Sequence, residues 1–159
     1  MQRTVTTVTT KYGDVEIVAT SPDHLHVSTN NGATLTVRKV PYSVSMHMRR
    51  WADGTWHLGK ESDTAYERSQ WFHASRTDRY TGPRDLYASQ PARDALRAEL
   101  ERVVNDWAPT PDAVAAMDAG TRYQAELNMS RVQHELSKAR TELARLEAEE
   151  THLLGILNS

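Results

Sequence analysis

Histidine is the residue type in this sequence that could do chemistry most directly. The stretch Asp23-His24-Leu25-His26 spaces two imidazoles so that both would lie on one face of a β-strand. Two ligands fall short of the four that structural zinc needs and the three that catalytic zinc needs. Because Leu25 is expected to face a core, His24 and His26 are expected to face solvent. We therefore predict no metal site here.

The other chemistry-bearing residues form no recognisable motif. His47, His57 and His73 are scattered among arginines and tryptophans, and no Ser-His-Asp arrangement can be identified. The sequence has no glycine-rich phosphate loop, no His-Glu-x-x-His motif and no cysteine. We predict no catalytic residue and no cofactor, so the protein is expected not to be an enzyme. A small hydrolase ranks last, and would need a pocket that joins one of these histidines to a carboxylate.

Arginines alternate with aromatic residues from residue 49 to residue 87. Residues 38–87 carry nine basic and six acidic groups, whereas the whole chain has a formal charge of −2. This mixture suits a protein-binding hot spot, and it equally suits a stacking platform for single-stranded nucleic acid. Ordinary core aromatics beside solvated arginines would look the same, and the small positive excess ranks nucleic acid below protein. The predicted binding residues are Arg49, Arg50, Trp51, Trp56, Trp71, Arg76, Arg79 and Tyr80.

Short antiparallel strands are predicted to position these residues. Residues 4–10 and 14–20 are rich in Val and Thr, which favours strands. A second hairpin is predicted around Gly32, with Val27 opposite Leu35, because this register keeps the apolar residues on one face.

A third hairpin is predicted around Gly54, with Arg50 opposite Trp56. Pro41, between the second and third hairpins, cannot donate to a ladder and predicts a corner or an edge. Residues 60–88 have no sustained period, but their length predicts a short helix or strand among them.

A helix is predicted over residues 89–107. Ser89 suits the N-cap and Pro91 the first turn. Apolar residues then recur at helical spacing, which predicts that this face covers the sheet; they are Ala92, Leu96, Leu100, Val103 and Trp107. The solvent side is predicted to hold Arg93, Arg97, Glu101 and Asn105.

A long helix is predicted from Thr110 and Pro111 to Leu157, with Gly120 and Thr121 as its one plausible break. From Met129 onward a narrow stripe steps by three and four residues over four heptads, as in a coiled coil, and only Glu150 is polar. A second copy of the chain is the expected partner, through residues 110–157, with strand number and direction left open. The predicted oligomerisation residues are Val132, Leu136, Leu143, Leu146, Leu153 and Leu157.

Together these patterns predict an α+β fold. An antiparallel β-meander or small open barrel, packed by one helix, forms residues 1–109, and a coiled-coil helix forms residues 110–159. No apolar run is long enough to cross a bilayer, and the N-terminus lacks the apolar core of a signal peptide. We expect a cytoplasmic protein with no membrane partner.

The run Arg50-Trp51-Ala52-Asp53-Gly54-Thr55-Trp56, followed by a Ser-capped helix that ends in Trp107, resembles small proteins of actinobacterial phages whose activities are not established. The likeness covers about residues 30–107 and implies a phage origin and a location in the host cytoplasm. The function expected is a non-enzymatic oligomeric interaction protein that binds a host or phage protein through its sheet domain. The alternative is a nucleic-acid-binding accessory protein that uses residues 49–87.

Overall fold

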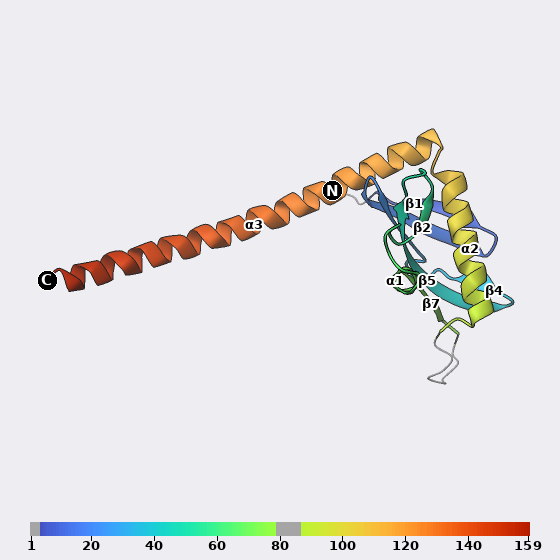
Figure 1. Cartoon of the computed structure of the whole chain (residues 1–159), viewed down its shortest axis with the longest axis horizontal. Coiled ribbons are helices and arrows are strands. Elements are labelled where there is room, and N and C mark those ends of the chain that lie inside the picture. The colour runs from blue at the N-terminus through green and yellow to red at the C-terminus, as the bar shows by residue number, and fades with distance from the viewer. Residues whose placement is uncertain (1–3, 79–86) are drawn as a thin grey trace. The chain divides into compact units, whose positions relative to one another are not determined.

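The computed structural model describes residues 4–78 and 87–159 (Figure 1). The chain divides into two compact units, Met1–Tyr123 and Gln124–Ser159, which are described separately. The elements of the described residues are β1 (Thr6–Thr10), β2 (Gly13–Ser21), β3 (His24–Ser28), β4 (Leu35–Val37), β5 (Val40–Arg50), β6 (Trp56–Leu58), α1 (Ala65–Ser69), β7 (Phe72–Arg76), α2 (Gln90–Trp107) and α3 (Pro111–Leu157).

The first unit is built on an open antiparallel sheet of seven strands. Its order is β1-β2-β3-β5-β4, and β6 and β7 also pair with β5. The eleven-residue strand β5 is therefore the hub of the sheet. This arrangement, followed by a long C-terminal helix, confirms the α+β class and the antiparallel sheet predicted from the sequence.

Side chains along β5 alternate between two faces of the sheet. Tyr42, Val44, Met46 and Met48 are buried and belong to the hydrophobic core, so their side is called the core face. The residues between them point the other way and are only half-buried, which defines the outer face. Those residues of β5 are Ser43, Ser45, His47 and Arg49.

The hairpin predicted around Gly32 is wrong. β3 pairs with β2 and β5, and Val27 lies opposite Met46 rather than Leu35. The physical reason is length, because β5 offers β3 a full five-residue ladder while β4 has only three residues. The left-handed backbone expected at Gly32 is nevertheless present, with a φ of 79°.

β4 instead forms a hairpin with β5. Val37 pairs with Val40, and the two residues between them, Arg38 and Lys39, both have positive φ, at 48° and 68°. Two left-handed residues are what a type I′ turn requires, although Asn and Gly normally supply them. Pro41, predicted at a corner or an edge, lies inside β5 opposite Thr36 of β4, the last strand in the order of the sheet.

The hairpin around Gly54 is confirmed. Arg50 pairs with Trp56, and Gly54 has a φ of 84°. This register turns Trp56 and Leu58 into the core, where each is only 4% exposed. The element predicted within residues 60–88 is also found, as α1 with a capping box between Thr64 and Glu67, and as β7.

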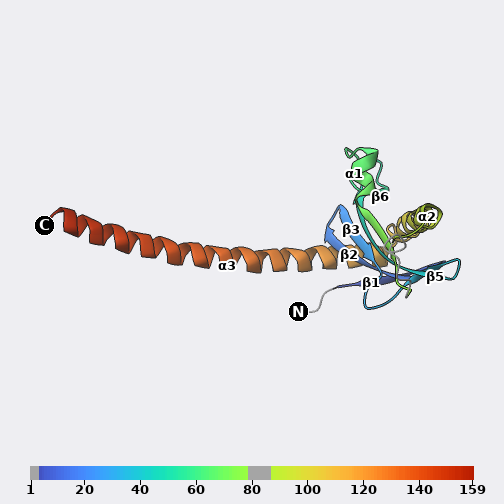
Figure 2. The same cartoon turned by 90° about the horizontal axis from the view of Figure 1, so that it is seen from below.

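α2 begins where the sequence predicts. The Ser89 side chain accepts a hydrogen bond from the backbone N–H of Ala92. Leu96, Leu100 and Val104 are fully buried and belong to the same hydrophobic core as the strands. Each such side chain contributes about 1.5–3 kcal/mol by leaving water. Figures 1 and 2 show α2 beside the strands.

Two residues predicted on the solvent side of α2 bind the rest of the unit instead. Asn105 accepts from the backbone N–H of Trp56 at 2.9 Å and donates to its carbonyl at 2.8 Å. Arg93 donates to the carbonyls of Ser69 and Phe72, both at 2.9 Å. Helical period alone placed them wrongly, because long polar side chains at the border of an apolar face reach back over the edge of the sheet.

The beginning of α3 belongs to the first unit. Ala113 is fully buried, and a Cβ added at Gly120 would come within 3.1 Å of the Ala19 carbonyl oxygen. Glycine lets the helix approach β2 this closely, and α3 runs on without the break considered at Gly120 and Thr121. The predicted boundary after residue 109 remains a prediction about which part folds alone.

The second unit consists of α3 from Gln124 onward. Across the described residues, no helix has both the length and the apolar character needed to cross a membrane.

Candidate binding surfaces

Three imidazoles meet on the outer face of the sheet. His26 lies directly opposite His47 in the β3–β5 ladder, and His24 lies opposite Arg49. The ring centroids of His26 and His47 are 4.7 Å apart, and those of His24 and His47 are 5.2 Å apart. The three histidines, together with Ser45, Arg49 and Trp71, are called the histidine cluster.

Hydrogen bonds fix the rings of this cluster. His24 Nε2 lies 3.1 Å from His47 Nδ1, so one of the two nitrogens donates and the other accepts. His24 Nδ1 lies 2.5 Å from Thr20 Oγ1, and His26 Nε2 lies 2.9 Å from Ser45 Oγ.

Trp71 borders the histidine cluster. The His47 backbone N–H donates to the Trp71 carbonyl at 2.9 Å, and the two rings meet edge to face with centroids 5.7 Å apart. The indole Nε1 donates to Asp63 at 2.9 Å, yet the residue keeps 36% of its surface exposed. Trp71 therefore offers a fixed aromatic surface beside the histidines.

The electrostatics of the cluster keep His24 and His47 neutral near pH 7. Partial burial, and then the Arg49 guanidinium and His47, lower the pKa of His24 to about 4. Burial and the charge of Arg49 also lower the pKa of His47. Arg49 is itself partly balanced by Asp23, whose carboxylate lies 3.7 Å away.

The side chains of the cluster are not arranged as a metal site. No group of three or more His, Asp or Glu side chains within residues 4–78 and 87–159 is arranged to hold a metal ion. What the cluster can offer is aromatic and hydrogen-bonding contact.

A second aromatic group lies around Trp51. Its ring stacks on His57 at a centroid distance of 4.1 Å, and the Arg68 guanidinium lies over it at 5.4 Å. The indole N–H donates to the Gly59 carbonyl at 3.1 Å. His57 also lies 3.9 Å from Asp53. It lines a pocket of about 340 Å³ with Trp51, Arg68 and Glu101, so this pocket joins a histidine to a carboxylate, as the hydrolase alternative requires. A hydrolase remains a prediction.

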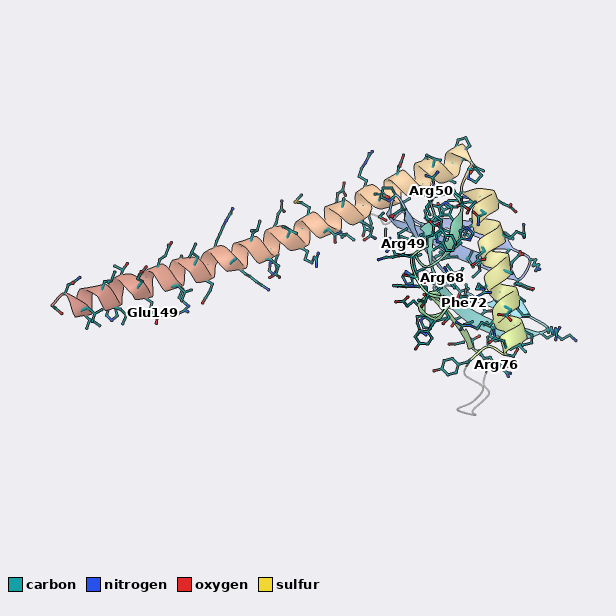
Figure 3. All side chains as sticks on the ribbon, in the orientation of Figure 1. Arg49, Arg50, Arg68, Phe72, Arg76 and Glu149 are labelled. Carbon is teal, nitrogen blue, oxygen red and sulfur yellow. The ribbon has the colours of Figure 1, made fainter. Side chains whose placement is uncertain are left out.

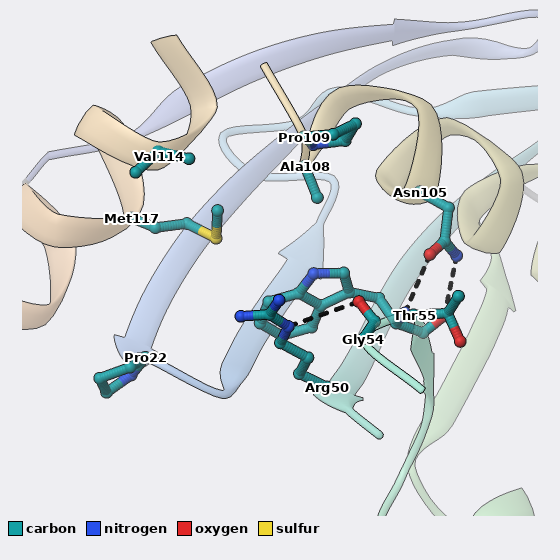
Figure 4. Close-up of a pocket in the computed structure, with 10 residues that line it drawn as sticks. Pro22, Arg50, Gly54, Thr55, Asn105, Ala108, Pro109, Val114 and Met117 are labelled. Atoms are coloured by element: carbon teal, nitrogen blue, oxygen red, sulfur yellow. Dashed lines mark hydrogen bonds between the residues drawn. The ribbon is translucent and has the colours of Figure 1, made fainter. Parts of the chain in front are cut away.

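Arg50 lies at a third place. It lines a pocket of about 360 Å³ with Trp56, Asn105 and Met117 (Figure 4). The Arg50 Nε donates weakly to the Gly54 carbonyl at 3.4 Å. Trp56 is buried in the core, so it is a structural residue with only an edge on this pocket.

The remaining predicted binding residues lie elsewhere or outside the described part. Arg76 makes a two-bond ion pair with Asp78, with a shortest N–O distance of 2.6 Å. Arg79 and Tyr80 fall outside the described residues. The predicted segment is thus distributed over several places, and only Arg49 and Trp71 of its described members lie together at the histidine cluster.

The predicted oligomerisation residues form a continuous exposed stripe on α3. They and Met129 are between 46% and 80% exposed, and Figure 3 shows side chains projecting all around this part of the helix, near Glu149. Arg131, Val132, Glu135, Leu136 and Ala139 line a shallow apolar depression along it.

Sequence reasoning missed the meeting of His47 with His24 and His26, because it paired β3 with the wrong strand. A usable signal was present in the alternation of Ser45, His47 and Arg49, which matches that of His24 and His26. Two strands that each alternate polar and apolar residues over a similar length are favoured to pair side by side, with their polar residues on the same face.

Comparisons with protein-family models, with curated proteins and with solved structures gave no match for this chain. The resemblance to phage proteins remains a prediction.

Proposed function

We propose that this protein is a self-associating interaction protein. Residues 129–157 of α3 form a coiled coil with a second copy, and the first unit presents the histidine cluster to another protein. One observation carries the proposal: the second unit is a helix with most of its large exposed apolar side chains along one narrow stripe. Such contiguous apolar surface usually marks an interaction site.

The spacing of the stripe supports a helical partner. Steps of three and four residues keep a seam facing one neighbouring helix, whereas a globular core needs a wider face. Each leucine contributes about 1.5–3 kcal/mol when fully buried, so the layers of two helices can offset the cost of association.

A charge placed in the stripe tests self-association. Leu143→Asp puts a carboxylate in the seam and is expected to convert the oligomer to a monomer, while the near-UV circular dichroism of the first unit stays unchanged. Ala148→Asp is the matched control, because it adds the same charge outside the seam. Light scattering that gives one mass for all three proteins contradicts the proposal.

The proposed partner surface on the first unit rests on Trp71. It is fixed by Asp63 and stands half-exposed beside neutral imidazoles, which suits an aromatic contact to protein better than a cationic track for phosphates. Trp71→Ala is expected to abolish partner retention in a pull-down, whereas Tyr66→Ala, which changes an exposed aromatic on α1, is expected to keep it.

Nucleic-acid binding is the alternative that this experiment separates. An oligonucleotide held at low salt, released by about 200 mM salt and lost in Trp71→Ala would favour it, because phosphate contacts weaken steeply with salt. Retention of protein after nuclease treatment favours the proposed function.

A further inference from the structure

The stripe of α3 contains information about the direction of pairing. With Met129 at heptad position a, position a also holds Leu136, Leu143, Glu150 and Leu157, and position d holds Val132, Ala139, Leu146 and Leu153. Glu150 is the only charged residue in the seam. Its surroundings therefore differ sharply between the possible arrangements.

A parallel arrangement places like charges together. In a parallel pair each a residue faces its own copy, so Glu150 would meet the partner's Glu150 inside the seam. A parallel trimer would bring three such carboxylates together. Burying like charges at this distance is costly, because neither can be neutralised by the other.

An antiparallel arrangement avoids this meeting. Position a of one helix then faces position d of the other. In the register that places Leu143 opposite the partner's Leu146, Glu150 faces the partner's Ala139. The small alanine leaves room for the glutamate stem to run outward to water. The same register forms two further apolar layers, Leu136 with the partner's Leu153 and Val132 with the partner's Leu157.

The charges beside the seam make different pairs in the two directions, which gives a way to tell them apart. Arg140 and Glu147 both occupy position e, and among the described residues neither forms an ion pair with another side chain of the chain. In this antiparallel register Arg140 lies beside the partner's Glu147, twice per dimer. In a parallel pair Glu147 would instead lie beside the partner's Glu142, with like charge, while Arg140 would lie beside the partner's Glu135, with opposite charge.

The glutamates at position g have partners within their own helix. Arg145 donates to Glu142 from Nε at 3.0 Å and from Nη2 at 2.9 Å, and to Glu149 from Nη1 at 2.9 Å. Glu142 and the partner's Glu149 approach each other in the antiparallel register. In each chain Arg145 binds both Glu142 and Glu149 of its own helix, and its positive charge offsets the repulsion between the two chains.

We infer that residues 132–157 pair antiparallel with a second copy, with Leu143 opposite the partner's Leu146. This inference rests on the proposed self-association. Chain order then joins the two first units to opposite ends of a paired segment about 40 Å long. Such a dimer bridges two partner molecules at a distance, whereas a parallel dimer would gather both at one end.

Glu147→Arg distinguishes the directions because its effect has opposite sign in each. Antiparallel pairing puts the new guanidinium beside the partner's Arg140 and is expected to raise the dimer dissociation constant about tenfold. Parallel pairing puts the same guanidinium beside the partner's Glu142 and would lower that constant. Glu126→Arg is the control, since it reverses a charge at the same heptad position outside the paired span.

The absence of cysteine allows a second, geometric test in an otherwise thiol-free chain. Arg140→Cys with Glu147→Cys is expected to give disulfide-linked dimers on mild oxidation. Glu135→Cys with Arg140→Cys joins neighbouring positions only in a parallel pair and is expected to stay unlinked.

The outcomes separate this inference from the proposed function. Unaltered chain that is monomeric by sedimentation overturns self-association itself. A dimer that is tightened by Glu147→Arg, or linked through the 135–140 cysteine pair, keeps the proposed function and overturns the antiparallel direction.

Discussion

The helices α2 and α3 carry similar apolar residues, but those of α2 are buried within their own unit and those of α3 are exposed. Along α2, Leu96 and Leu100 are completely buried by the strands of their own unit. Along α3, Leu143 and Leu146 are 56% and 48% exposed. The difference lies in the width of the stripe. α2 adds Val103 and Val104 side by side, which widens its face to cover a sheet, whereas the stripe of α3 is two residues wide per heptad from Met129 to Leu146.

The width of an apolar helix face thus predicts what will cover it. A wide face can be buried by the strands of the same chain, while a two-in-seven seam fits one more helix. It follows that substitutions on α2 should change folding, and matched substitutions on α3 should change association.

The largest expected effect is at Leu100. Leu100→Ala removes a fully buried side chain and is expected to lower the free energy of unfolding of the first unit by about 3–5 kcal/mol. Leu143→Ala should leave that free energy unchanged and weaken self-association instead. Urea titrations followed by tryptophan fluorescence measure the first effect. Equal losses of unfolding free energy in both variants would contradict the different roles assigned to the two helices.

Glutamates on α2 and α3 differ in the same way as the leucines. Glu99 is 3% exposed, accepts the Lys11 backbone N–H at 3.0 Å and binds Arg102 at 2.9 Å. Glu99→Ala leaves the part-buried Lys11 N–H without its acceptor and is expected to lower the unfolding free energy by about 1–2 kcal/mol. Glu142→Ala on α3 removes a solvent-exposed pair with Arg145 and should leave the urea midpoint of the first unit unchanged.

Two glycines within α3 extend the contrast. Gly120→Val would drive a branched side chain into Ala19 and is expected to cost about 1–3 kcal/mol in the first unit. Gly155→Ala meets nothing within 4 Å and is expected to stabilise the helix of the second unit by up to about 1 kcal/mol. Thermal unfolding followed by far-UV circular dichroism measures both, and stabilisation by Gly120→Val would contradict the close packing of α3 on β2.

Acid is expected to destabilise the first unit through His24. The pKa of His24 is about 4 in the folded protein and about 6.5 when unfolded, so between these values the unfolded chain binds more protons. Stability is therefore lost as the pH falls from about 6.5 towards 4. His24→Asn should flatten the pH dependence of the urea midpoint in this window. His134→Asn, in the second unit, is the control, and an equally steep slope in both variants would contradict the assignment.

Much of the fold could be predicted from local patterns. The Ser89 cap, the apolar period of α2 and the Asp53-Gly54 turn each depend on a few neighbouring residues, and each is found in the structure. The open antiparallel sheet and the long C-terminal helix follow from the same patterns.

Strand pairing between distant residues could not be predicted in the same way. Val27 can satisfy its alternation against Leu35 or against Met46, and only the length of β5 decides between them. The turn at Arg38 and Lys39 carries no glycine or asparagine, so its left-handed backbone is imposed by the strands that it joins. The histidine cluster depends on that non-local pairing, and it was therefore missed.

The contacts of side chains at the border of the apolar face of α2 could not be predicted from the helical period either. Asn105 follows the polar side of the α2 period, yet it completes the hydrogen bonds of the Trp56 backbone. The predicted binding arginines were dispersed for the same reason, since spacing along the chain does not give the face of the sheet on which each residue lies.

Self-association through α3 is tested most directly by the mass of the unaltered chain in solution. Sedimentation equilibrium at tens of micromolar chain separates the 18.0 kDa monomer from a dimer of twice that mass, about 36 kDa. The self-associating chain is expected to show the dimer mass, falling towards that of the monomer on dilution. A mass of 18.0 kDa throughout the concentration series would contradict it.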